Sequence, residues 1–95
     1  MIKIISKNDK IKIEGHSGYS EYGSDIVCAS VSSIATATIN GILKYDEGAL
    51  EYIKDDGYLE VSILKHDEVI DLFIDNMFEM FKDLEKKYGK YVKLI

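Results

Sequence analysis

Cys28 and His16 carry the side chains of this sequence that are best suited to nucleophilic chemistry. Cys28 is the only cysteine and His16 is one of two histidines. Both lie in the stretch EGHSGYSEYGSDIVCAS, residues 14–30, together with three glycines. An imidazole within hydrogen-bond reach of a thiol can accept its proton and leave a nucleophilic thiolate. The pattern therefore fits a thiol-based site, but it also fits a solvent-exposed loop histidine followed by a packed cysteine.

The elements expected around this pair can place it at one site. We expect Cys28 in the first turns of a helix that begins at Ser24 or Asp25, where free amides and the positive end of the helix dipole favour a thiolate. His16 follows a strand that ends at residues 14–15 and so projects into a loop. The amides around Val27 and Cys28 are then expected to form an oxyanion hole.

The segment between the two residues predicts a movable loop rather than a phosphate or metal site. No residue from 13 to 43 is a lysine or arginine, and the glycines match neither the P-loop nor the dinucleotide-binding spacing. His16, Cys28 and His66 are too few ligands, without paired spacing, for a metal. We therefore predict no cofactor and no metal, and a substrate-gating loop that contains Gly18, Tyr19, Tyr22 and Gly23.

The rest of the chain predicts one α/β (α+β) domain over residues 1–95, in the order ββαββαβ. Strands are expected at 1–6, 10–14, 49–54, 58–63 and 91–95, and helices from about residue 25 to 44 and from 66 to 88. The expected architecture is a sandwich in which two helices pack on an antiparallel or mixed five-stranded sheet. The apolar face of the second helix is very wide, which indicates either a thick aromatic core or a subunit interface.

Composition restricts the partners and the compartment. Seventeen acidic against twelve basic residues give a net charge of −5, which argues against nucleic acid and favours a basic partner. A single cysteine cannot form an intrachain disulfide. The short apolar start, Met1 to Ile5, is interrupted by Lys3, so we expect no secretory or membrane-spanning segment there and a cytoplasmic protein.

The run GHSGYSEYGSDIVCASVSSIATATINGI, residues 15–42, resembles the signature of the ribosomal-processing cysteine protease Prp family. In that family a Gly-His-(Ala/Ser)-Gly-Tyr segment is followed, after a short loop, by Asp-Ile-Val-Cys-Ala and a helix. The resemblance implies a small homodimeric endopeptidase that removes the N-terminal extension of a bacterial large-subunit ribosomal protein.

Carried over by position, the resemblance implies that His16 is the catalytic base and Cys28 the nucleophile, with Asp25 and Ser32 in supporting positions. Asp25 can orient the imidazole, but a helix cap alone also explains an aspartate there. Ser32, one turn beyond Cys28, can donate to the sulfur or to substrate, but a small residue there also lets the helix pack closely. The alternative function is a non-catalytic ribosome-associated binding module of the same fold, in which Cys28 is merely packed.

Overall fold

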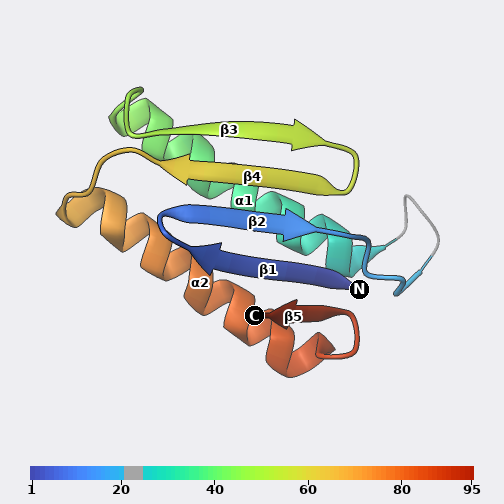
Figure 1. Cartoon of the computed structure of the whole chain (residues 1–95). Coiled ribbons are helices and arrows are strands. Elements are labelled where there is room, and N and C mark those ends of the chain that lie inside the picture. Colours follow the sequence, from blue (N-terminus) through green and yellow to red (C-terminus); the bar gives the residue numbers. More distant parts are fainter. Residues whose placement is uncertain (21–24) are drawn as a thin grey trace.

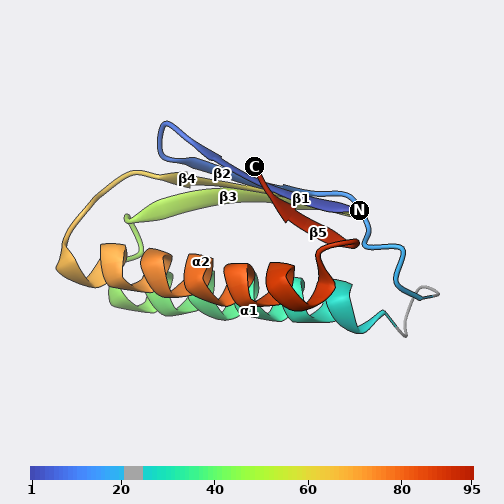
Figure 2. The same cartoon turned by 90° about the horizontal axis from the view of Figure 1, so that it is seen from below.

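Seven elements form two layers, with both helices on one face of the sheet (Figures 1 and 2). The protein is described by a computed structural model that covers residues 1–20 and 25–95. The elements are β1 (Ile2–Lys7), β2 (Lys10–Glu14), α1 (Ile26–Tyr45), β3 (Leu50–Asp55), β4 (Tyr58–Ile63), α2 (Glu68–Tyr88) and β5 (Val92–Leu94). This order confirms the expected ββαββαβ fold.

The sheet is mixed, in the strand order β3-β4-β2-β1-β5. β1 pairs in parallel with β5, and the other neighbouring strands are antiparallel. Asn8 and Asp9 connect β1 to β2 with φ angles of 53° and 62°, as a two-residue hairpin turn of positive φ requires. β3 is left as an edge strand, next to β4 alone in this sheet.

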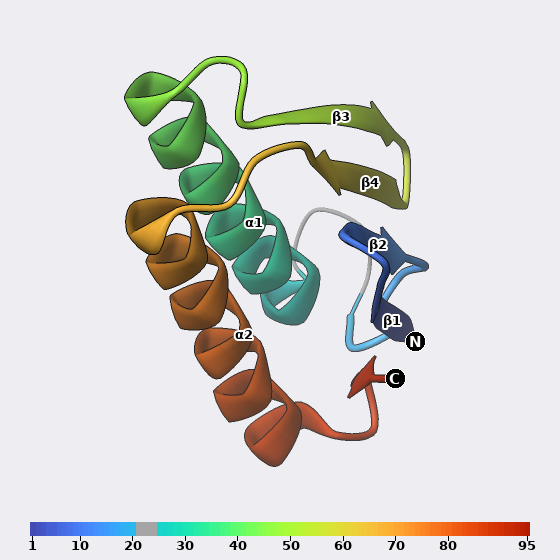
Figure 3. The ribbon, with the colours of Figure 1, turned by 60° about the vertical axis from the view of Figure 1, so that its left-hand side comes forward.

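The core lies between the sheet and the two helices, which pack side by side (Figure 3). Alternate positions of β1, β2 and β4 point into it, as a half-buried sheet requires. Its fully buried side chains include Ile4, Ile11, Val27, Ile42, Ile70, Phe81 and Val92. α1 is long and apolar enough to span a membrane, a test that core helices of soluble proteins also pass, and here its buried face packs in this core.

α2 begins at Glu68, two residues later than the sequence predicted. Asp67 is its N-cap, and its carboxylate accepts a 2.8 Å hydrogen bond from the Ile70 amide. His66 therefore lies outside the helix, where its ring contacts Asp9 at 2.9 Å and Asp71 at 2.7 Å. Apolar periodicity alone does not distinguish the capping residue from the first helical turn, which explains the error.

The wide apolar face of α2 is mostly core. Within this helix, all of which the structure describes, the exposed members of that face are Leu72, with 69% of its surface accessible, and Met80, with 43%. The remaining members are buried or half-buried: Val69, Ile70, Phe73, Ile74, Met77, Phe78, Phe81 and Leu84. α1 and the sheet thus cover most of the face within one chain.

The His66 cluster predicts a pH dependence of stability. Hydrogen bonds to Asp71 and then Asp9 raise the pKa of His66 above 6.5, so its stabilising effect is complete below pH 6.5 and is lost as pH rises through the raised value. We expect the difference in urea midpoint between the wild type and His66→Asn to be largest at pH 5.5 and to shrink towards pH 8.5. Asp9→Asn should reduce the same difference, and a difference that grows with pH would contradict the assignment.

Candidate active site

Cys28 lies in the first turn of α1, with its side chain half-buried. Asp25 is the N-cap of this helix, and its Oδ1 accepts 3.0 Å hydrogen bonds from the amides of Val27 and Cys28. Aspartate is a preferred N-cap because its carboxylate satisfies helix amides that have no other partner. The cap thus fixes the backbone directly beneath the thiol.

The second oxygen of Asp25 is held by Ser17. The Ser17 hydroxyl donates to Oδ2, and the hydroxyl oxygen in turn accepts a 3.1 Å hydrogen bond from the Tyr19 amide. Burial alone would raise the pKa of the Asp25 carboxyl, but hydrogen bonds from Ser17, Cys28 and Val27 outweigh burial and lower it from 3.8 to about 2. The carboxylate is therefore ionised at neutral pH.

The sulfur of Cys28 accepts a hydrogen bond from the chain that follows β2. The donor is the backbone N–H of Ser17, 3.2 Å from Sγ. Ser17 is only 3% exposed, so the donor side of this contact is shielded from water. The segment after β2 and the start of α1 are thus joined directly at the thiol.

His16 is placed by the β2 end and by the turn between β3 and β4. The Gly15 amide donates to the Gly57 carbonyl at 2.8 Å, and the amino group of Met1 donates to the His16 carbonyl. A Cβ on Gly57 would lie 2.8 Å from Nε2 of His16, and Gly57 has φ +66°. The ring therefore rests on this turn, and only a glycine there leaves it room.

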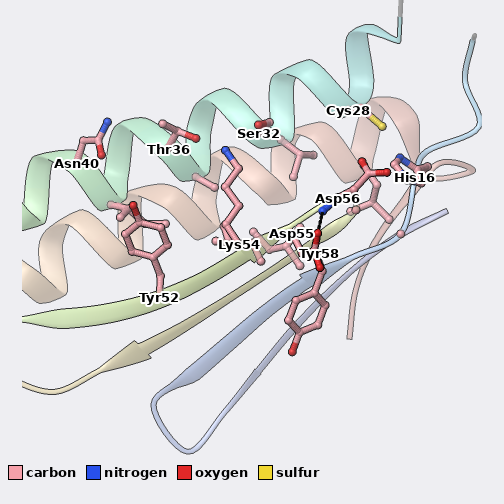
Figure 4. Close-up of a pocket in the computed structure, with 18 residues that line it drawn as sticks. His16, Cys28, Ser32, Thr36, Asn40, Tyr52, Lys54, Asp55, Asp56 and Tyr58 are labelled. Carbon is pink, nitrogen blue, oxygen red and sulfur yellow. Dashed lines mark hydrogen bonds between the residues drawn. The ribbon is translucent and has the colours of Figure 1, made fainter. Parts of the chain in front are cut away.

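Cys28 and His16 line one end of an open cleft of about 470 Å³ between α1 and β3 (Figure 4). Asp56, from the β3–β4 turn, points to the same end (Figure 4). From this end, polar side chains continue along both walls of the cleft. On α1 they are Ser32, Thr36 and Asn40, each one helical turn from the next, and on β3 they are Tyr52 and Lys54. Apolar side chains of α1 and the sheet line the cleft between these polar groups, so the channel that leads away from the thiol has both polar and apolar walls.

A match to a protein-family model identifies the family to which this fold and site belong. The model described as "Cysteine protease Prp" matches residues 1–93. This chain belongs to the cysteine protease Prp family. Membership in a protease family favours an enzyme over the binding module, as does a half-buried thiol that shares a cleft with a histidine.

Named relatives and solved structures agree with the Prp assignment. The "Ribosomal processing cysteine protease Prp" of Staphylococcus aureus (strain Mu50 / ATCC 700699) is 26% identical, over 95% of this chain and 92% of that protein. The crystal structure of Prp from S. aureus with a covalently linked product peptide has a TM-score of 0.87 at 22% identity, over 98% of this chain and 94% of that one. SMU.848 from Streptococcus mutans gives 0.75 at 23% identity, over 98% and 89%. These structures support the fold.

The helix amides do not form the oxyanion hole that the sequence predicted. The N–H groups of Val27 and Cys28 both donate to Asp25, and the Ala29 amide donates to the Asp25 carbonyl at 3.1 Å. The prediction treated the first amides of α1 as free, but the N-cap side chain occupies two of them. Of the two roles considered for Asp25, the structure shows the helix cap.

The expected gating loop is described only in part. Tyr22 and Gly23 lie outside the described residues. Tyr19 does not line the cleft; it makes edge-to-face contacts with Tyr88 and Tyr91, at centroid distances of 5.7 and 5.1 Å. The first half of the loop is thus attached to the end of α2 and the approach to β5.

Within residues 1–20 and 25–95 no His, Cys, Asp or Glu cluster could hold a metal ion.

Sequence reasoning placed Ser17 in the loop without contact to the His16–Cys28 pair, which is wrong because its N–H contacts Sγ, and it did not connect Gly57 with His16. Ser17 had no signal beyond its place beside His16, because its contacts cross from one element to another. Gly57 lies in the connection expected between the strands at 49–54 and 58–63, yet its contact with the His16 ring depends on the pairing of β2 with β4. Both become visible only when the strands are in register.

We predict that Gly57→Ala displaces the His16 ring. The added methyl would lie 2.8 Å from Nε2, too close for the ring to stay, so the ring proton signals of His16 should move by NMR. The protein should also lose about 1–2 kcal/mol of stability because alanine is strained at positive φ. Gly18→Ala is the matched control, because Gly18 has φ +71° with nothing within 4 Å of an added Cβ. Gly18→Ala should lose a similar amount of stability without moving the His16 ring signals. If the His16 ring signals are the same in both variants, the contact with Gly57 does not hold the ring.

Proposed function

We propose that this protein is a cysteine endopeptidase that removes the N-terminal extension of a bacterial large-subunit ribosomal protein, with His16 as base and Cys28 as nucleophile. The observation that carries the proposal is the placement of both side chains at one end of an open cleft (Figure 4). The S. aureus relative is named a ribosomal processing cysteine protease, which supports the substrate class. A net charge of −5 favours encounter with a basic ribosomal protein.

The proposed reaction proceeds through an acyl-enzyme. His16 takes the thiol proton, and Sγ attacks the scissile carbonyl carbon while the C=O π electrons move to the oxygen. The imidazolium then protonates the leaving amine, the C–N bond breaks and a thioester remains. Water, deprotonated by His16, hydrolyses the thioester and restores the thiol. A site that depends on a reduced thiol fits the cytoplasm, which we propose as the location.

The channel beyond Cys28 suits an extended peptide. Its floor includes Tyr52 and Lys54 of β3, the edge strand, whose outer backbone groups are free of sheet partners among the described residues. Ser32 lies next to Cys28 on the opposite wall, exposed and directed to the cleft (Figure 4). We propose that Ser32 contacts the substrate, not the core.

Loss of either dyad residue should abolish processing. We expect Cys28→Ser and Cys28→Ala to reduce cleavage of a candidate extended ribosomal protein by about 10³-fold or more, and His16→Ala by about 10²- to 10⁴-fold. Mass spectrometry of the shortened product measures the effect.

His66→Ala is the matched control for these variants, since His66 lies in the connection from β4 to α2, at the other end of β2 and β4 from His16. It should cleave at the wild-type rate at pH 7. Substantial cleavage by Cys28→Ala would refute Cys28 as the nucleophile. Loss of activity in His66→Ala but not in His16→Ala would refute His16 as the base.

We further propose that the protein is a homodimer that pairs through its helix layer. Ile26 and Met80 are 50% and 43% exposed and line, with Leu84, a shallow groove of about 630 Å³ between α1 and α2. Burying a large apolar side chain contributes about 1.5–3 kcal/mol, and a two-fold axis would cover the groove of both copies at once.

Sedimentation at micromolar concentration should give twice the 10.8 kDa mass of one chain. Met80→Glu should give the single mass, because it places a charge in the apolar groove. Ile53→Glu is the control, since Ile53 is 63% exposed but lies on β3, away from the helices. A monomeric wild type would refute the dimer, and dissociation by Ile53→Glu alone would place the interface on the sheet.

A further inference from the structure

The charged and polar groups around the Cys28 sulfur come from three parts of the chain. The Ser17 N–H donates to Sγ at 3.2 Å, and His16 precedes it. Asp25 lies beneath the sulfur at the helix N-terminus, and Asp56 points to the same end of the cleft from the β3–β4 turn (Figure 4). Two of these groups are carboxylates, and the negative charge of each disfavours a thiolate at the nearby sulfur.

The Asp25 carboxylate is an obstacle to negative charge at Cys28. It is ionised at neutral pH and is hydrogen-bonded to both the backbone N–H and the thiol of Cys28, so it favours the neutral thiol over the thiolate. It also occupies the Val27 and Cys28 amides that would otherwise stabilise a developing oxyanion. A site with this cap needs a donor from elsewhere. Ser17 is the residue whose N–H is already directed at the sulfur.

We propose that the backbone N–H of Ser17 is a catalytic hydrogen-bond donor, first to the Cys28 thiolate and then to the oxyanion formed beside it, and that the Ser17 hydroxyl, bound to Asp25, holds this N–H in position. The inference rests on the proposed function. When Sγ bonds to the carbonyl carbon and the π pair moves to oxygen, that oxygen lies next to the sulfur. A donor 3.2 Å from Sγ is within reach of both atoms.

The Ser17 hydroxyl has two effects that act in the same direction. It fixes the Ser17 backbone against the start of α1, through a side chain that is 3% exposed. It also donates to Oδ2 of Asp25, which weakens the carboxylate as an acceptor for the Cys28 thiol and so favours the thiolate. Removing the hydroxyl should therefore lower the thiolate fraction and misplace the N–H.

Alkylation of Cys28 by iodoacetamide across pH tests the thiolate, and it requires no peptide substrate. Cys28 is the only cysteine, so labelling is specific. Ser17→Ala should move the labelling midpoint upward by about half a pH unit and reduce kcat by about tenfold with KM little changed. Ser17→Thr keeps a hydroxyl and should restore most of both. Ser30→Ala, which removes a hydroxyl bonded to the Ile26 carbonyl in the same helical turn, should change neither.

A single-atom change tests the N–H itself. Ligation at the Val27–Cys28 junction gives the full chain with an ester in place of the amide between His16 and Ser17, which removes the N–H and keeps the hydroxyl. Compared with the all-amide protein made in the same way, kcat should fall about 10²-fold, as for loss of one oxyanion donor. The labelling midpoint should rise as well.

An ester protein with unchanged kcat and unchanged labelling would overturn the proposal. So would a folded Ser17→Ala protein whose labelling midpoint equals that of Ser30→Ala. If no extended ribosomal protein is cleaved even by the wild type, the proposed function fails. The labelling midpoints still decide whether the Ser17 N–H stabilises the thiolate, so the two failures are distinguishable.

Discussion

The Asp25 carboxylate is the group on which the rest of the site depends. One oxygen caps α1 through the amides of Val27 and Cys28, and the other binds the Ser17 hydroxyl. The cap fixes where the helix begins and hence where the Cys28 side chain projects. The bond to Ser17 attaches the segment that carries His16 to the same point. Fold and site therefore share one interaction, and its N-cap contribution is about 1 kcal/mol.

Three segments that are distant in sequence meet at this end of the sheet. Antiparallel pairing of β2 with β4 places the β2 end beside the β3–β4 turn, where Glu14 pairs with Tyr58. Gly57 then supports the His16 ring from below, and Gly15 allows close approach of Met1, whose carbonyl would lie 2.3 Å from a Cβ at that position. Glycines at these points allow backbone and imidazole to approach each other closely, which a side chain would prevent.

Much of the fold was predictable because its signals are local. The strand character of β1 and β2, the short connection between β3 and β4 and the apolar face of α2 each depend on residues close in sequence, and each was predicted. The start of α2 was misplaced because Asp67 differs from a first-turn acid only in backbone conformation. The pair of His16 and Cys28 was suggested by residue type and strengthened by a family signature. Their common cleft was not predictable from periodicity, since it depends on strand register and on where α1 begins.

The oxyanion hole shows most clearly why local rules fail at the site. A helix N-terminus offers free amides in general, and an aspartate N-cap occupies them in general; the two rules conflict at Cys28. The contacts settle the conflict in favour of the cap. This choice leaves an ionised carboxylate close to the nucleophile, an arrangement that disfavours a thiolate in isolation. An amide donor from outside the helix and the His16 ring, which takes the thiol proton in the reaction we propose, offset that charge, and both belong to the segment that Ser17 attaches to the cap. The residue that creates the electrostatic difficulty thus also holds the groups that relieve it.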